Sequence, residues 1–309
     1  MLSRVAENIY WLARYVERAE NTARLINVNT NLMLDLPKFA RPGWEPIVEI
    51  LGADNGGEGL PEDADERSVL HYLISDTNNP ASILSSLLMA RENGRTIRDI
   101  IPREAWEKVN DLYLVAKQDA GKGISKRGRY DYLGSVISGA QTLTGVLAGT
   151  MLHDDGYSFL RMGRNLERAD MTTRIIDVRT ADLLEEMHED LTPFENIQWM
   201  SVLKSLTGYQ MYRRTIQVRI QRPEVLRFLF QEKRFPRAFY HTVCEVEECL
   251  TSLPHNKEPL AKLRPLQDKV LKADPAKLRQ EQLHKFIDKL QLGLAGVHNV
   301  IGKTYFLHS

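Results

Sequence analysis

Hydrophobic positions recur with a helical period along nearly the whole chain. In the first segment, apolar residues alternate at spacings of four and three: Val5, Ile9, Leu12, Val16, Ala19, Ala23 and Ile26. These spacings put one continuous apolar stripe on a single face of a helix. A long helix is therefore predicted from Ser3 to about Leu34.

The same period predicts helices up to the end of the chain, and the alternating runs typical of strands are nearly absent. The further predicted helices cover residues 44–52, 68–75, 80–99, 103–119, 130–153, 155–187, 193–220, 223–230, 236–253, 256–272 and 276–306. The connections between them are mostly short, which favours antiparallel neighbours. The predicted fold class is all-α, an antiparallel helical bundle.

Two segments 150 residues apart resemble each other. Residues 10–28 and 160–178 are identical at eight of nineteen positions, namely Arg14/Arg164, Glu17/Glu167, Arg18/Arg168, Ala19/Ala169, Thr22/Thr172, Arg24/Arg174, Ile26/Ile176 and Val28/Val178. A weaker match at an offset of 156 aligns 73–83 with 229–239. We interpret the chain as one domain, 1–309, made of two pseudo-symmetric halves of about 1–150 and 151–309 by internal duplication.

The match includes the polar face of the helix as well as its apolar stripe. On a helical wheel, the polar face of the first copy holds Glu7, Trp11, Arg14 and Arg18, with Glu17 and Arg24 at its flank. In the second copy, the corresponding residues are Arg161, Arg164, Arg168, Glu167 and Arg174. Both helices are therefore predicted to be covered on two sides, with arginines and glutamates forming a half-buried ionic layer or lining a cleft.

This Arg/Glu face allows three interpretations. It can be purely structural, since Glu20–Arg24 and Asp170–Arg174 are favourable pairs one turn apart. It can be a cleft for a carboxylate or phosphate, because guanidinium groups bind such anions in a bidentate manner. It can also belong to a metal- or phosphate-dependent enzyme that uses Asp154 and Asp155, although these acids equally suit the start of the helix at 155.

Composition narrows these alternatives. The chain has 41 Lys and Arg and 41 Asp and Glu, so its net charge gives no reason to expect nucleic acid or a membrane surface as a partner. The N-terminus has no signal peptide, no stretch is long and apolar enough to span a membrane, and the two cysteines suit a reducing, cytoplasmic compartment. No nucleophile motif, phosphate-binding glycine loop or complete metal-ligand set is present, so no catalytic residue is identified and no metal site is predicted.

Three motifs resemble the alpha-E domain family: MLSRVAENIYWLARYVERAENTARL, HDDGYSFLRMGRNLERADMTTRI and the final KTYFLH. They occur in the order seen in that family and extend over essentially the whole chain. The resemblance adds Arg4 to the candidate ligand- or partner-binding residues and carries over to Asp154, Asp155, Arg161, Arg164, Glu167 and Arg168. Tyr157 departs from the family pattern, where tryptophan is expected, but it keeps a large aromatic side chain.

The resemblance implies a helical protein that acts beside, or fused to, a circularly permuted ATP-grasp protein, with a transglutaminase-like peptidase as a further associate. The expected function is an accessory binding subunit of an ATP-dependent, amide-bond-forming peptide modification system. It would have no cofactor of its own; a phosphate, nucleotide or divalent metal would come through the partner. A stand-alone enzyme and a pure scaffold remain the alternatives.

Overall fold

A computed structural model describes the whole chain except residues 42, 53–59, 61–63, 186–194, 217–218 and 307–309. The described residues form helices and connections, without strands. The helices are α1 (Ser3–Asp35), η1 (Lys38–Ala40), α2 (Glu45–Leu51), α3 (Glu66–Ile74), α4 (Ile83–Thr96), α5 (Arg103–Ile124), α6 (Arg129–Thr150), α7 (Asp155–Glu185), α8 (Glu195–Ser205), α9 (Tyr209–Ile216), α10 (Arg222–Gln231), α11 (Phe239–Ser252), α12 (Lys257–Lys272), η3 (Pro275–Lys277) and α13 (Gln280–Tyr305). The all-α prediction is confirmed.

The chain divides into two compact units. Unit 1 contains Met1–Asn29 and Ile47–Arg164, and unit 2 contains Thr30–Pro46 and Asn165–Ser309. The long helices α1 and α7 therefore each contribute to both units. These limits differ from the predicted halves, because residues 30–46 belong to unit 2 and residues 151–164 to unit 1.

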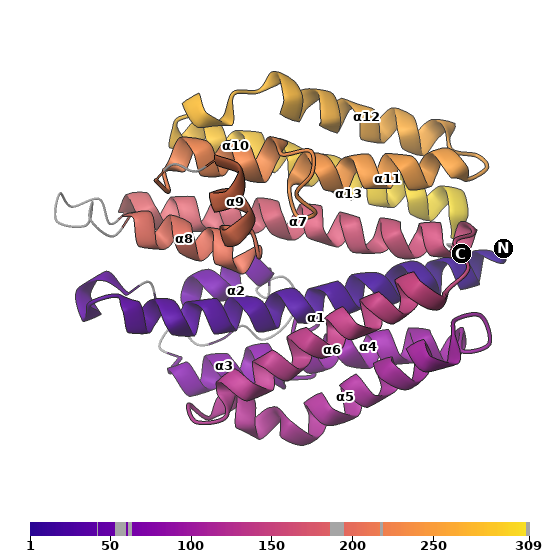
Figure 1. Cartoon of the computed structure of the whole chain (residues 1–309), viewed down its shortest axis with the longest axis horizontal. Coiled ribbons are helices and arrows are strands. Elements are labelled where there is room, and N and C mark those ends of the chain that lie inside the picture. Colours follow the sequence, from indigo (N-terminus) through magenta and orange to yellow (C-terminus); the bar gives the residue numbers. More distant parts are fainter. Residues whose placement is uncertain (42, 53–59, 61–63, 186–194, 217–218, 307–309) are drawn as a thin grey trace. The chain divides into compact units, whose positions relative to one another are not determined.

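Within each unit, consecutive helices pack against each other as antiparallel neighbours. In unit 1, α5 packs against both α4 and α6, and in unit 2, α12 packs against both α11 and α13 (Figure 1). The cores lie between these helices. Fully buried residues include Leu73, Leu87, Val109, Leu133 and Val136 in unit 1, and Leu226, Val243, Leu263, Ile287 and Leu290 in unit 2.

The predicted apolar stripe of α1 is buried from Ile9 to Ile26, and only Val5 at its start is half-exposed. On the opposite side of α1, Glu17, Asn21 and Leu25 are buried as well. The prediction that this helix is covered on two sides is thus confirmed.

The single helix predicted over 193–220 is wrong in one respect. α8 ends at Ser205, and Thr207 adopts a positive φ of 55°. The Gly208 N–H then donates to the Leu203 carbonyl at 2.7 Å, so the chain closes α8 with a left-handed cap before α9 begins. The predicted start of this helix, with Thr192 as its cap, lies outside the described residues.

Several elements keep the offsets of the sequence match. α2 and α8 begin 150 residues apart, and α4 and α11 have the same length of 14 residues at an offset of 156. Buried threonines also match: Thr22 Oγ1 donates to the Ala81 carbonyl at 3.4 Å, and Thr172 Oγ1 donates to the Arg237 carbonyl at 2.9 Å. Each hydrogen bond joins a long helix to the turn before a 14-residue helix of the same unit. These equivalences agree with an internal duplication, which stays a prediction.

The two threonine hydrogen bonds give a first testable prediction. Thr172→Val keeps the shape of the side chain but loses the donor, so we expect the free energy of unfolding to fall by about 1 kcal/mol, and less for Thr22→Val because its bond is longer. Urea denaturation followed by circular dichroism measures the loss. Thr142→Val, at an exposed position of α6, is the control and should be near neutral. A Thr172→Val protein as stable as the control would contradict the role assigned to this bond.

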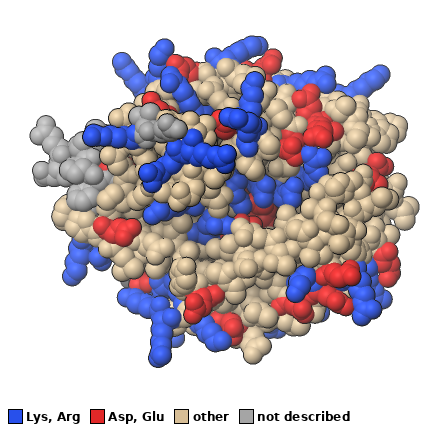
Figure 2. Space-filling view, viewed as in Figure 1, with Lys and Arg blue, Asp and Glu red and all other residues tan. Residues whose placement is uncertain are grey.

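The described helices contain no segment long and apolar enough to cross a membrane. On the face seen in Figure 2, acidic and basic side chains are mixed over α5. A band without charge follows α6, whose sequence from Tyr132 to Thr150 contains no Asp, Glu, Lys or Arg. The surface of unit 1 is therefore neutral along one helix and ionic along the next.

Candidate functional site: the arginine-bearing helix faces

The sequence-predicted residues of α1 lie at different depths. Arg4 is exposed, Glu7, Trp11, Arg14, Arg18 and Arg24 are half-buried, and Glu17 is 3% exposed. All of them belong to unit 1. The polar face predicted from the sequence is thus neither a solvated surface nor a dry core. It is a layer in which Glu17 is buried and the arginine side chains still reach solvent.

Four residues of α1, Trp11, Arg14, Tyr15 and Arg18, form what we call the arginine ladder. The rings of Trp11 and Tyr15 stack with centroids 5.3 Å apart and an interplanar angle of 28°. The Arg14 guanidinium carbon lies 5.0 Å from the Trp11 ring centroid, and that of Arg18 lies 5.5 Å from the Tyr15 centroid. The spacing i, i+3, i+4, i+7 places these side chains on one face, so rings and guanidiniums alternate along the helix.

The ring contacts restrict the position of each guanidinium. A cation–π contact attracts the charged group to the ring and leaves N–H groups able to donate hydrogen bonds to an anion. Arg14 Nη1 also donates a long hydrogen bond of 3.4 Å to the Tyr10 hydroxyl. Arginines held in this way lose little conformational freedom when they bind a planar carboxylate or a phosphate, because the ring contacts have already ordered them.

An ion pair lies further along α1, between Glu20 and Arg24. Arg24 Nη2 donates to Glu20 Oε1 at 2.6 Å, and Gln141 Nε2 of α6 donates to the same oxygen at 3.3 Å. The matching pair in unit 2 joins Arg174 Nε to Asp170 Oδ2 at 2.8 Å. The structural interpretation therefore accounts for Arg24 and Arg174, which are held by acids one turn earlier on the same helix.

The beginning of α7 shows what Asp154 and Asp155 do. Asp154 Oδ1 accepts hydrogen bonds from the backbone N–H groups of Gly156 at 2.8 Å and Tyr157 at 3.3 Å, so Asp154 caps α7. Asp155, in the first turn, carries the negative charge that a helix N-terminus favours. Both carboxylates are exposed and occupied with starting the helix, which favours a structural role over the metal- or phosphate-dependent site considered from the sequence.

Further along α7, the repeated arginines divide between the units. Arg161 and Arg164 belong to unit 1, and Glu167, Arg168 and Arg174 belong to unit 2. Their depths match those of the α1 counterparts: Glu167 is 2% exposed, like Glu17, and Arg164 and Arg168 are half-buried, like Arg14 and Arg18. The pattern of a buried acid beside half-buried arginines thus occurs on both helices.

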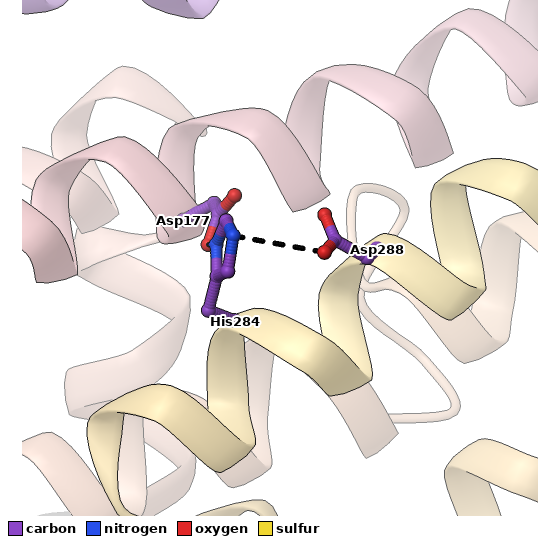
Figure 3. A group of neighbouring side chains, drawn as sticks. All are labelled: Asp177, His284 and Asp288. Carbon is purple, nitrogen blue, oxygen red and sulfur yellow. Dashed lines mark hydrogen bonds and ion pairs between the residues drawn. The ribbon is translucent and has the colours of Figure 1, made fainter.

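Sequence reasoning missed one group of potential metal ligands in unit 2. Asp177 of α7 and His284 and Asp288 of α13 place one possible ligand atom each within 4.8 Å of one another (Figure 3). Among the residues that the structure describes, this is the one group of three or more His, Cys, Asp or Glu side chains close enough to share a metal ion. His284 Nδ1 lies 2.8 Å from Asp177 Oδ1. Burial raises the pKa of Asp177 above its ordinary value, and the hydrogen bond from His284 partly offsets that rise. The available sequence signal was the His284–Asp288 spacing of four, which puts both side chains on one helix face.

Comparisons with known proteins place these features in a family. The Alpha-E family, described as a predicted alpha-helical domain with a conserved ER motif, matches residues 1–306. The chain has the Glu-Arg dipeptide in both copies of the repeated segment, as Glu17-Arg18 and Glu167-Arg168, and again at Glu66-Arg67. No solved structure matches the chain significantly.

Similar curated proteins come from mycobacteria. An uncharacterized protein of Mycobacterium bovis and one of Mycobacterium tuberculosis strain CDC 1551 are each 22% identical over 316 residues. An uncharacterized protein of M. tuberculosis strain H37Rv is 21% identical over the same length. The matches cover 96% of this chain but 35% of each relative, so the chain spans about a third of their length. The match over residues 1–306, together with the repeated Glu-Arg helices, shows that this chain belongs to the Alpha-E family.

Proposed function

We propose that this protein is an accessory binding subunit that works with a circularly permuted ATP-grasp protein in the modification of a peptide. In this proposal the arginines of each helix, Arg14 and Arg18 on α1 and their repeats Arg164 and Arg168 on α7, bind anionic groups, carboxylates or phosphates, carried by the partner or its substrate. The subunit supplies binding and orientation, and the bond-forming chemistry takes place on the partner, in the cytoplasm where ATP is available. A transglutaminase-like peptidase would act on the product.

The observation that carries this proposal is the arginine ladder itself. Arg14 and Arg18 are half-buried, ordered against aromatic rings and repeated as Arg164 and Arg168. Acids one turn earlier on the same helix pair with Arg24 and Arg174, and the rings of Trp11 and Tyr15 order Arg14 and Arg18. Preordered guanidiniums at the edge of solvent are typical of sites that bind carboxylates and phosphates.

The double substitution Arg14→Ala with Arg164→Ala tests the proposal. Each charge-assisted contact to an anion contributes about 1.5–3 kcal/mol, so we expect affinity for the ATP-grasp partner, or its amide-forming rate in the presence of the subunit, to fall at least about 10-fold. Pull-down and kinetic assays of the reconstituted pair measure this loss.

The matched control is Arg95→Ala with Arg103→Ala, which removes two exposed arginines of unit 1 and should leave both readouts within about two-fold of wild type. Circular dichroism and thermal unfolding verify that both double variants fold. Unchanged partner binding and unchanged ligase activity in a folded Arg14/Arg164 variant would refute the proposal.

A further inference from the structure

The cluster of Asp177, His284 and Asp288 lies within unit 2 and is independent of the arginine ladder. Asp177 comes from α7, and His284 and Asp288 lie one turn apart on α13, so the imidazole stands between two carboxylates (Figure 3). Because α7 and α13 are far apart in sequence, only the fold brings these side chains together. His and carboxylate side chains on adjacent helices are a frequent source of ligands for divalent cations.

The distances assign different tasks to the two ring nitrogens of His284. Nδ1 lies 2.8 Å from Asp177 Oδ1, which is hydrogen-bond distance, and an ionised carboxylate can only accept. The proton of the neutral imidazole is therefore on Nδ1, and the lone pair of Nε2 faces Asp288. This is the carboxylate–histidine arrangement that orients a metal-binding imidazole in many proteins.

The separation on the other side of the ring fits a shared cation. His284 Nε2 and Asp288 Oδ2 are 3.6 Å apart, which is beyond a good hydrogen bond. Two ligands that each bind Zn²⁺ at about 2.1 Å with a tetrahedral angle stand about 3.4 Å apart. Only a small side-chain adjustment would therefore let both atoms bind one ion.

Charge favours a cation at the same place. With a neutral imidazole, Asp177 and Asp288 bring two negative charges to one ring, and Asp177 is partly buried, with 16% of its side chain exposed. On the same helix, Lys285 is paired with Glu281. The two positive charges of a divalent ion would balance the two carboxylates. With one carboxylate and a neutral imidazole, the same ion would leave one positive charge without a counter-charge.

We propose that His284 Nε2 and Asp288 bind a divalent transition-metal ion of the Zn²⁺ class, with Asp177 orienting His284 and water completing the coordination. The imidazole ligand selects Zn²⁺ over Mg²⁺ and Ca²⁺, which prefer oxygen ligands throughout. The ion would join two side chains of α13, and the hydrogen bond from His284 to Asp177 would connect the site to α7. Half of the site is open to solvent, since 55% of the His284 side chain is exposed, so the ion would exchange readily.

Isothermal titration of the full chain with Zn²⁺ tests this proposal, and Co²⁺ absorption spectra give a second, coordination-sensitive measurement. We expect one equivalent bound by the wild type, a loss of affinity of at least 10-fold in His284→Ala and Asp288→Asn, and a loss of about 10- to 100-fold in Asp177→Asn. His71→Ala removes an exposed histidine of unit 1 and should leave the binding unchanged.

Three results would overturn the proposal. The first is no binding of Zn²⁺ by the folded wild type, and the second is equal affinity in His284→Ala, Asp288→Asn and the His71→Ala control. The third is binding of Mg²⁺ as tightly as Zn²⁺, which would show that the imidazole is not a ligand. All substituted side chains reach the surface, so the variants should fold, and circular dichroism verifies this.

Discussion

Gly163→Ala is expected to destabilise the protein by about 3 kcal/mol, the upper end of the range for overpacked cores. Gly163 lies on α7 and Tyr10 on α1, both within unit 1. A Cβ atom at position 163 would stand 3.0 Å from the Tyr10 carbonyl carbon and overlap its carbonyl oxygen. Because the obstacle is helix backbone rather than the tip of a side chain, the two helices would have to move apart.

The same substitution should disturb the arginine ladder. In an α-helix the carbonyl of residue 10 accepts the hydrogen bond from the N–H of residue 14, so displacing the Tyr10 carbonyl also displaces Arg14. Tyr10 is fully buried and packs edge-on against Trp11 at 5.8 Å, which transmits the shift to the ring that holds Arg14. The tight helix contact at Gly163 thus sets the geometry on which the proposed function depends.

Gly145→Ala is the matched control. Gly145 lies inside α6 with nothing within 4 Å of the position of a Cβ atom, so alanine should stabilise the protein by about 0.5–1 kcal/mol through helix propensity. Chemical denaturation of the two variants measures the difference. If Gly163→Ala were as stable as Gly145→Ala, the close approach of α7 to the Tyr10 carbonyl would be wrong.

Hydrophobic periodicity predicted most of the helices within a few residues, because local spacing decides which face is buried. It misplaced ends where side chains make local turns. The helix predicted from Pro80 begins at Ile83, since Asn79 Oδ1 accepts from the Ala81 N–H and Ser82 Oγ caps Ser85. It also missed the break at Thr207, where a residue other than glycine adopts a left-handed conformation that its type does not signal.

The candidate site was predictable only as far as it is local. Arg14, Glu17 and Arg18 could be found because a helical repeat displays them at fixed spacing. Asp177 and His284 are 107 residues apart and meet through tertiary packing, so their pairing leaves no trace in the spacing of either segment. The close approach of α7 to Tyr10 at Gly163 could not be predicted for the same reason. The counterpart of Gly163 in the first copy is Ala13, and a small residue alone does not indicate which backbone packs against it.

Glu66→Gln is expected to destabilise the protein by about 2–4 kcal/mol, because breaking a buried ion pair leaves an uncompensated charge. Arg129, the first residue of α6, has a side chain that is 5% exposed, and its Nη1 donates to Glu66 Oε1 at 2.7 Å. Its Nη2 donates to the Ile124 carbonyl at 3.3 Å. Glu66 itself is 34% exposed at the start of α3 and also lies 3.5 Å from Lys126 Nζ, which places the expected cost slightly below that of a fully buried pair.

A double-mutant cycle separates the pair from its surroundings. Glu66→Gln leaves the buried guanidinium without its acid, whereas Arg129→Met removes the charge that needs the acid, so Glu66→Gln should cost far less in an Arg129→Met background. We expect a coupling energy above about 1 kcal/mol from urea denaturation of the four proteins. The exposed pair Arg103–Glu107 is the control, and Glu107→Gln should change stability by less than about 0.5 kcal/mol. Additive effects of Glu66→Gln and Arg129→Met would show that this ion pair does not join α3 to α6. The stability of this part of unit 1 would then come from the apolar contacts of α3 and α6 with α5 alone.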